Sequence, residues 1–204
     1  MIYYRNTPLI FAFILLPFCA LKAQTKVIGE CTLQYVIKQL NSDDTIGYKL
    51  VYVKGDQCKT TLQTSHLTQT LLFNVQQSTA TITKDIGTSH FLQSVVYPPL
   101  SQPNLISMKE IASDTLVQIL GYNCKSVELK WSDGVVYQIV YTTDIATTVN
   151  TFELAFKEVA GLVLSYTIIP VSGQAIQYRA TKIDLSPISL SQFNINKDLY
   201  QIID

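Results

Sequence analysis

Alternation of apolar and polar residues is the dominant pattern of this chain. Apolar side chains stand at every second position from Cys31 to Ile37 and, less strictly, from Val135 to Tyr141. A period of two is expected for a β-strand that buries one face. Weaker alternation runs through residues 67–73 and 162–168, and the many Thr, Val, Ile and Tyr residues suit a pleated, half-buried surface. The chain is therefore predicted to be mainly β.

Turn residues divide the alternating runs into about ten or eleven strands in meander order. The pair Asp133-Gly134 predicts a hairpin, because both residues tolerate the positive φ of a type I′ turn. Gly55-Asp56 and Ser172-Gly173 are similar punctuation. The strands are predicted at residues 27–40, 46–54, 57–64, 67–75, 78–85, 89–96, 115–120, 123–131, 134–143, 161–169 and 174–185.

Helix is scarce in this pattern. One candidate runs from Leu105 to Ser113, after a proline-rich connection, and a second lies within Asn150 to Ala160. No repeat, low-complexity tract or linker indicates a second domain. Because twist accumulates from strand to strand, one sheet of this many strands should curl strongly. We predict one domain, residues 24–204, in which a single curled antiparallel sheet forms an open half-barrel with one or two short helices.

The N-terminal stretch has the pattern of a cleaved signal peptide, predicted to cover residues 1–23. Arg5 precedes an apolar run from Leu9 to Leu21, and Ala23 supplies the small residue that a signal peptidase requires. The run is short for a membrane span, which takes about 20 apolar residues. Two alternatives stay open: an uncleaved anchor, and lipid attachment at Cys19, although the bulky Phe18 before it is unsuited to that modification. The remaining chain is expected to act outside the cytoplasm without a transmembrane segment.

The charge balance excludes one large class of partner. Loss of Arg5 and Lys22 with the signal removes two of 15 basic residues and none of the 15 acidic ones, which leaves a net charge of −2. Nucleic-acid binding depends on clustered Lys and Arg that neutralise phosphates. We therefore expect no nucleic-acid partner.

Three cysteines remain after signal removal: Cys31, Cys58 and Cys124. In an oxidising compartment an odd count suggests one disulfide among them plus a leftover thiol. The sequence does not choose among the three pairings. The alternative is that all three are small buried apolar side chains.

No arrangement of residues points to catalysis, a metal or a cofactor. His66 and His90 lie in separate predicted strand regions without His-x-x-x-His or His-Glu pairing. The acidic sites Asp43-Asp44 and Ser132-Asp133-Gly134 are interpreted as turns, because Asp bonds to its own backbone there. The chain is expected to be a non-catalytic protein.

Four stretches of the C-terminal half are similar to a family of exported, functionally uncharacterised proteins of Gram-negative bacteria. They are, in order, residues 121–125 (Gly-Tyr-Asn-Cys-Lys), 140–145, 156–166 and 180–183. The fold of this family resembles the periplasmic lipoprotein carrier LolA and the receptor LolB. The likeness extends from Leu116 to Ile202, while the amphipathic N-terminal helix of LolA-like carriers has no counterpart here.

The resemblance implies a periplasmic protein with an open barrel whose concave apolar face takes up acyl chains. A lipid, a lipoprotein acyl chain or another envelope protein would then be the partner. Aromatic and aliphatic side chains on the alternating faces are the candidate lining of this concave face, or else an ordinary packed core. They are Leu33, Tyr35, Phe73, Phe91, Tyr137, Ile139, Tyr141, Leu164 and Tyr166. The alternative function is an interaction module with a filled core and an exposed sheet edge.

Overall fold

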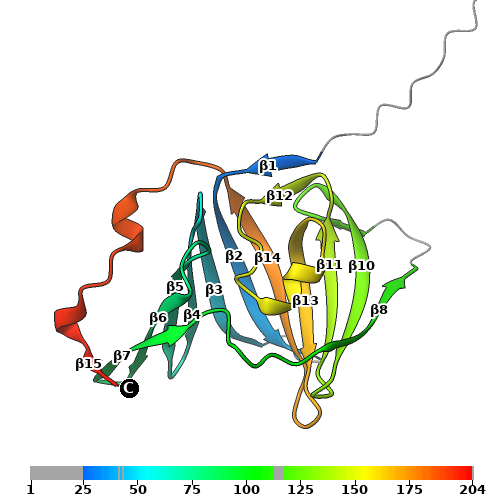
Figure 1. The fold of residues 1–204 in the computed structure, drawn as a ribbon. Helices are drawn as coiled ribbons and strands as arrows, with labels where there is room; N and C mark the ends of the chain where they lie inside the picture. The colour runs from blue at the N-terminus through cyan, green and yellow to red at the C-terminus, as the bar shows by residue number, and fades with distance from the viewer. Residues whose placement is uncertain (1–24, 41, 43, 113–116, 204) are drawn as a thin grey trace, which may run out of the picture.

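The computed structural model describes residues 25–40, 42, 44–112 and 117–203. Within them the chain is mainly β, and most strands join one large antiparallel sheet that curls without closing (Figure 1), as the sequence predicts. The strands are β1 (Lys26–Ile28), β2 (Glu30–Gln39), β3 (Thr45–Lys54), β4 (Gln57–Thr64), β5 (Thr68–Asn74), β6 (Thr79–Ile86), β7 (Ser89–Val96), β8 (Leu105–Ile111), β9 (Val117–Ile119), β10 (Tyr122–Trp131), β11 (Val136–Thr142), β12 (Ile145–Thr147), β13 (Leu162–Ile169), β14 (Ile176–Asp184) and β15 (Gln201–Ile202).

The large sheet has a simple order with one long-range junction. Strands β2 to β7 follow one another as a meander, and so do β10, β11, β13 and β14, with β8 at the far edge beside β10. The two halves meet where β14 pairs antiparallel with β2. Two short pairings are parallel, β15 with β7 and β1 with β12, and the second pair forms a separate small sheet.

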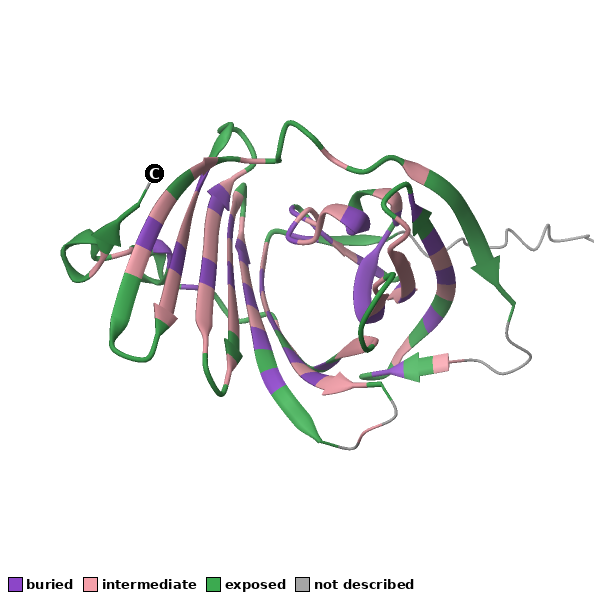
Figure 2. Ribbon diagram, turned by 90° about the horizontal axis from the view of Figure 1, so that it is seen from below, coloured by how far each residue is buried: buried purple, intermediate pink, exposed green. Residues whose placement is uncertain are grey.

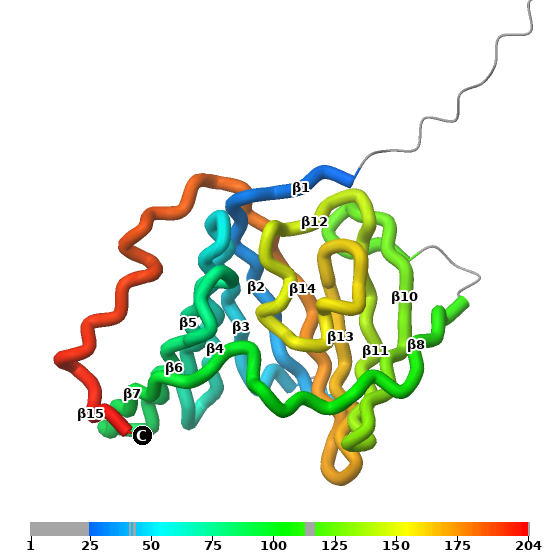
Figure 3. The backbone as a smooth tube through the Cα atoms, in the orientation of Figure 1, coloured from blue at the N-terminus to red at the C-terminus, as the bar shows by residue number. Residues whose placement is uncertain are grey.

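The two halves of the sheet have different shapes. Viewed from below in Figure 2, the strands from β2 through β14 to β8 wrap around a central segment, while β3 to β7 extend to one side. We call β3 to β7 the wing. The connection of residues 97–104, here called the strap, crosses the open side from β7 to β8 (Figure 3). The opening of the curled sheet therefore lies between the wing and the central segment.

The central segment comprises residues 149–161, between β12 and β13, and fills the curled half from inside. It contains the short 3-10 helix η1 (Leu154–Glu158). Its buried side chains Val149, Phe152, Phe156 and Val159 belong to the same core cluster as residues of the surrounding strands. Packing density in such a core leaves few voids. This half of the sheet is therefore filled by the protein's own chain.

Inner-face burial falls from the middle of the sheet toward the wing. Residues that pair on neighbouring strands form rows across the sheet, and one such row consists of Tyr35, Lys49, Leu62 and Gln69 on β2 to β5. Tyr35 and Lys49 are buried, whereas Leu62 and Gln69 are half-buried. The inner face of the wing thus retains apolar side chains that the core does not cover.

The C-terminal segment covers the outer face of the wing. It runs through the 3-10 helices η2 (Leu190–Phe193) and η3 (Lys197–Leu199) to β15 (Figure 1). Lys59 Nζ donates to the Gln192 carbonyl at 2.9 Å, and Lys54 Nζ donates to the Ile188 carbonyl at 2.8 Å. Phe193 is buried there. The chain end is therefore part of the folded unit.

Three details of the sequence prediction were wrong. Leu105 to Ser113 is no helix: β8 occupies Leu105–Ile111, because pairing with β10 decides a segment whose own pattern is ambiguous. The predicted strand at 27–40 is interrupted at Gly29 between β1 and β2. The Asp133-Gly134 hairpin exists, but only Gly134 has positive φ, so its turn is not type I′. The remaining helix candidate, Asn150 to Ala160, contains η1.

The entry into β13 requires a glycine. Gly161 has a φ of +151°, and a Cβ placed there would lie 2.1 Å from the Thr142 carbonyl oxygen. No side chain fits such an approach. This close contact sets where the central segment ends and the buried strand β13 begins.

Candidate functional site

The structure brings most of the predicted site residues into one core. Tyr137 and Tyr141 are half-buried and pack against it. Phe91 lies apart, half-buried on β7 beside Lys84 and Gln201. The fully buried members are Leu33, Tyr35, Phe73, Ile139, Leu164 and Tyr166. Five of these side chains are packed against their neighbours and leave little surface for a ligand, whereas Phe73 also borders a cavity beneath the strap.

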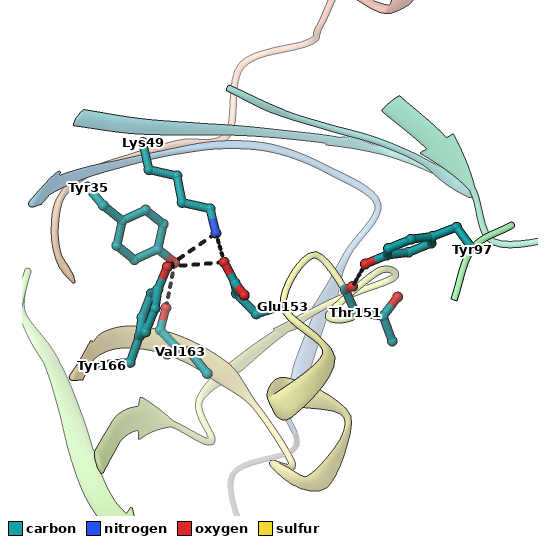
Figure 4. A network of polar contacts seen from close by, with 7 residues as sticks. All are labelled: Tyr35, Lys49, Tyr97, Thr151, Glu153, Val163 and Tyr166. Carbon is teal, nitrogen blue, oxygen red and sulfur yellow. Dashed lines mark hydrogen bonds and ion pairs between the residues drawn. The ribbon is translucent and has the colours of Figure 1, made fainter. Parts of the chain in front are cut away.

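A buried ion pair links the wing to the central segment. Lys49, on β3, extends its ammonium to Glu153 Oε1, and both groups also contact the Tyr166 hydroxyl (Figure 4). The Lys49 side chain is 6% exposed and that of Glu153 is 28% exposed. A charge so far from water is retained in proteins only with a partner. Glu153 is therefore the counter-ion that permits Lys49 on the inner face.

Aromatic rings enclose the same ammonium. Lys49 Nζ lies 5.6 Å from the ring centroids of Phe152 and Tyr166 and 5.8 Å from that of Tyr178. Tyr166 and Tyr178 are stacked, with centroids 4.4 Å apart. Cation–π attraction at a desolvated site adds to the ion pair. Lys49 is thus held by the Glu153 carboxylate and the Tyr166 hydroxyl, among three aromatic rings.

Two tyrosine hydroxyls donate to backbone carbonyls, one in β13 just after the central segment and one within that segment. Tyr35 donates to the Val163 carbonyl at 2.8 Å, and Tyr97, at the start of the strap, donates to the Thr151 carbonyl at 2.7 Å (Figure 4).

Burial, reinforced by the charge of Glu153, raises the pKa of Tyr178 to about 12. Burial likewise raises the pKa of Tyr166. Both phenols therefore stay protonated near neutral pH.

A cavity of about 240 Å³ opens between the wing and the central segment, beside the ion pair. Its walls combine apolar side chains with polar groups from four strands, the strap and the central segment. They are Lys49, Thr60, Leu62, Gln69, Leu71, Tyr97, Phe152, Glu153, Leu154 and Tyr178. We call it the inner cavity.

A second cavity of about 260 Å³ adjoins the first beneath the strap. Tyr97 and Leu154 line both cavities and form the wall that they share. The other residues that line this second cavity include Phe73, Val75 and Pro98, with Lys157 at one side. We call it the strap cavity. The two cavities thus lie side by side along the open side of the sheet, separated by this shared wall.

Sequence reasoning missed Lys49 and Glu153. Lys49 belongs to the alternate residues of its strand that face the core, and Val51 and Val53 follow it in that set. A lysine in such a position looks the same in the sequence as a lysine at a strand end, because its ion-pair partner is not visible there. Glu153 lies 104 residues later, in a segment interpreted as a short helix. The position of Lys49 among the inward-facing residues of its strand is the one sequence signal for this ion pair.

The three cysteines are separate buried thiols. Cys31 and Cys58 face the same core, but Val53 pairs with each of them and lies between them. Two strand spacings amount to roughly 9.5 Å, and a disulfide requires Cα atoms within about 7 Å. Cys124 lies on β10 in the other half of the sheet.

The buried thiols are expected to resist modification in the folded protein. Burial raises the pKa of Cys31 to about 11 and raises that of Cys58 and Cys124, so the reactive thiolate is scarce at pH 8. With Cys19→Ser as background, Ellman's reagent should count no fast-reacting thiol in the native protein and three in guanidinium chloride. Fewer than three in denaturant would show that a disulfide forms.

The histidines stay apart in the structure. His66 is exposed in the turn between β4 and β5, and His90 Nδ1 lies 2.8 Å from Asp85 Oδ1 near the β6–β7 turn. The described part of the chain contains no group of three or more His, Cys, Asp or Glu arranged to hold a metal ion.

Within the same residues, no helix has the length and apolar character needed to cross a membrane.

Two comparisons of this chain were made, one with protein families and one with curated proteins. No protein-family model matches it, and no curated protein matches it either. The assignment of a function therefore depends on the geometry of the site.

Proposed function

We propose that this chain is a non-catalytic binding protein that holds an apolar group, such as the acyl chain of an envelope lipid or lipoprotein, between the wing and the central segment. The observation that carries the proposal is the pair of adjoining cavities lined by Leu62, Leu71, Tyr97 and Leu154. Ligand pockets usually measure roughly 300–1,000 Å³ and combine apolar walls with a few polar groups. Each cavity alone falls short of that range, and a ligand that uses both has to pass the shared wall of Tyr97 and Leu154.

The architecture also supports this role. The curled half is filled, so the ligand would lie along the wing, where inner-face side chains such as Leu71 and Ile82 are only half-buried. The likeness of the C-terminal half to the LolA/LolB-like family favours an acyl ligand. A signal peptide over residues 1–23 would place the protein in the periplasm, free to move unless Cys19 is lipidated.

The binding site can be tested by filling it. Leu62 and Gln63 are neighbours on β4; Leu62 lines the inner cavity, whereas Gln63 is exposed. Leu62→Trp is expected to weaken binding of the apolar probe N-phenyl-1-naphthylamine at least tenfold, because the indole occupies the cavity. Gln63→Trp, the matched control, should bind the probe like the unmodified protein.

Native mass spectrometry of protein isolated from the cells that make it provides the second measurement. We expect a co-purifying lipid-sized adduct that is absent from Leu62→Trp. A ligand-free spectrum, combined with equal probe binding by both tryptophan variants, would contradict the proposal.

A second candidate function has one observation in its favour. Strand β8 is the edge of the large sheet and exposes Ile106 and Met108, which are 62% and 50% accessible. Exposed edge strands are templates for pairing with another chain. An envelope protein that adds a strand at β8 is therefore the alternative, and a pull-down that returns one stoichiometric partner, lost on Met108→Pro, would support it.

A further inference from the structure

We propose that the inner cavity selects an uncharged, hydroxyl- or amide-bearing head group and rejects a carboxylate or phosphate of the same chain length. This inference rests on the proposed function and names the class of ligand: a neutral single-chain amphiphile. It follows from how the charges and hydrogen-bonding groups of the cavity wall are already committed.

The charges of the cavity wall cancel each other. Among the described residues that line the inner cavity, Lys49 and Glu153 alone carry charge, and they form an ion pair with each other. An incoming anion would lie beside the Glu153 carboxylate and would be repelled by it. Lys49 would attract the anion only weakly, because its ammonium is already paired with Glu153. In a site with little water, an uncompensated like charge is costly. The wall is therefore hostile to a second negative charge.

Uncharged polar groups of the same wall remain available. Thr60 is 8% exposed, yet its hydroxyl makes no hydrogen bond to any other described residue. The side-chain amide of Gln69 and the hydroxyl of Tyr178 are likewise without a hydrogen-bond partner in the described part of the chain. These three groups offer donors and acceptors without net charge. Hydroxyl and amide groups are the ligand chemistry that complements them.

The rest of the ligand is expected to be apolar. Leu62, Leu71 and Leu154 surround the polar groups of the inner cavity, and Phe73, Val75 and Pro98 line the strap cavity beyond the shared wall. Lys157, the cation at the side of the strap cavity, is 44% exposed and lies 3.8 Å from Glu158. Solvent and this carboxylate both weaken its attraction for an anion. The strap cavity therefore adds apolar contact and little preference for a charged head.

Competition between two ligands of equal chain length tests the proposal. Monododecanoylglycerol and dodecanoate are titrated at pH 8, where the acid is ionised, against bound N-phenyl-1-naphthylamine and below their micellar concentrations. We expect the neutral glyceride to displace the probe at a concentration at least tenfold lower. Equal or better competition by dodecanoate would overturn the inference. If the probe does not bind the unmodified protein, the proposed function fails before head-group selection is tested.

A charge change at Glu153 should reverse the preference. In Glu153→Gln the Lys49 ammonium loses its counter-ion, so dodecanoate becomes the better competitor by about tenfold. Glu110→Gln, a control at an exposed carboxylate on β8 that does not line either cavity, should keep the original order. Unchanged preference in Glu153→Gln would contradict the role of the ion pair.

A second variant decides the matter if Glu153→Gln does not fold, as judged by circular dichroism. The double change Lys49→Met with Glu153→Gln removes both charges and leaves Thr60, Gln69 and Tyr178 in place. The wall then holds no cation for a carboxylate, so the glyceride should keep its advantage of at least tenfold over dodecanoate. Equal competition by the two ligands in the double variant would overturn the proposal.

Discussion

Replacement of Glu153 by alanine is expected to destabilise the protein by about 3 kcal/mol, the lower end of the range for removing one partner of a buried ion pair. The lower end applies because the Glu153 side chain is 28% exposed, whereas that of Lys49 is 6% exposed. The cost arises from an ammonium left without a counter-ion among aromatic rings. Urea denaturation should show a lower midpoint with an unchanged m-value.

Two further variants separate this cost from simple loss of contacts. Lys49→Met combined with Glu153→Leu removes both charges and should recover most of the lost stability, because apolar replacement of a buried pair is often neutral. Lys182→Met removes an exposed pair, in which Lys182 and Asp184 lie 2.9 Å apart, and should cost less than about 1 kcal/mol. A change below about 1 kcal/mol for Glu153→Ala would show that Lys49 reaches water.

Replacement of Phe156 by alanine is expected to cost about 3–5 kcal/mol, the usual range for truncation of a buried aromatic residue. Phe156 is 1% exposed, and its ring packs edge-on against Tyr166 at 4.9 Å and Phe152 at 5.3 Å between centroids. Loss of the ring leaves a hole at the centre of the curled half. Thermal or urea unfolding measures the effect.

A graded series at this position provides the control. Phe156→Leu keeps most of the apolar volume and should cost less than half as much as Phe156→Ala. If both variants lose less than about 1.5 kcal/mol, the central segment would not be part of the cooperative core, and the interior would be open to a larger ligand than proposed.

The proposed ligand site and the stability of the core depend on the same segment. Phe152, Glu153 and Leu154 line the inner cavity, while Ala155 and Phe156 directly after them are buried in the core. One short stretch therefore plugs the curled half and shapes the remaining opening toward the wing. This arrangement explains why the two cavities beside the central segment are small.

Much of the fold was predictable from local pattern. Alternation from Cys31 to Ile37 correctly indicated a strand with one buried face, because side-chain direction in a strand repeats every two residues. It failed at Leu105 to Ser113, where no residue of β8 is buried and pairing with β10 imposes the extended form. The site was harder to predict: the aromatic residues chosen from alternation are mostly core, and the cavity lies against half-buried residues such as Leu62.

By itself the sequence determined the local quantities: strand periodicity, turn positions, a curled open sheet and a balance of charge that disfavours nucleic acid. Only the tertiary structure decided what occupies the hollow and where an opening remains. Those outcomes depend on contacts between distant residues, such as Lys49 with Glu153 and Tyr97 with Thr151. The pattern within one strand does not show which residue pairs with an inward-facing lysine. That partner lies far away in the sequence and is brought to the lysine only when the sheet curls around the central segment.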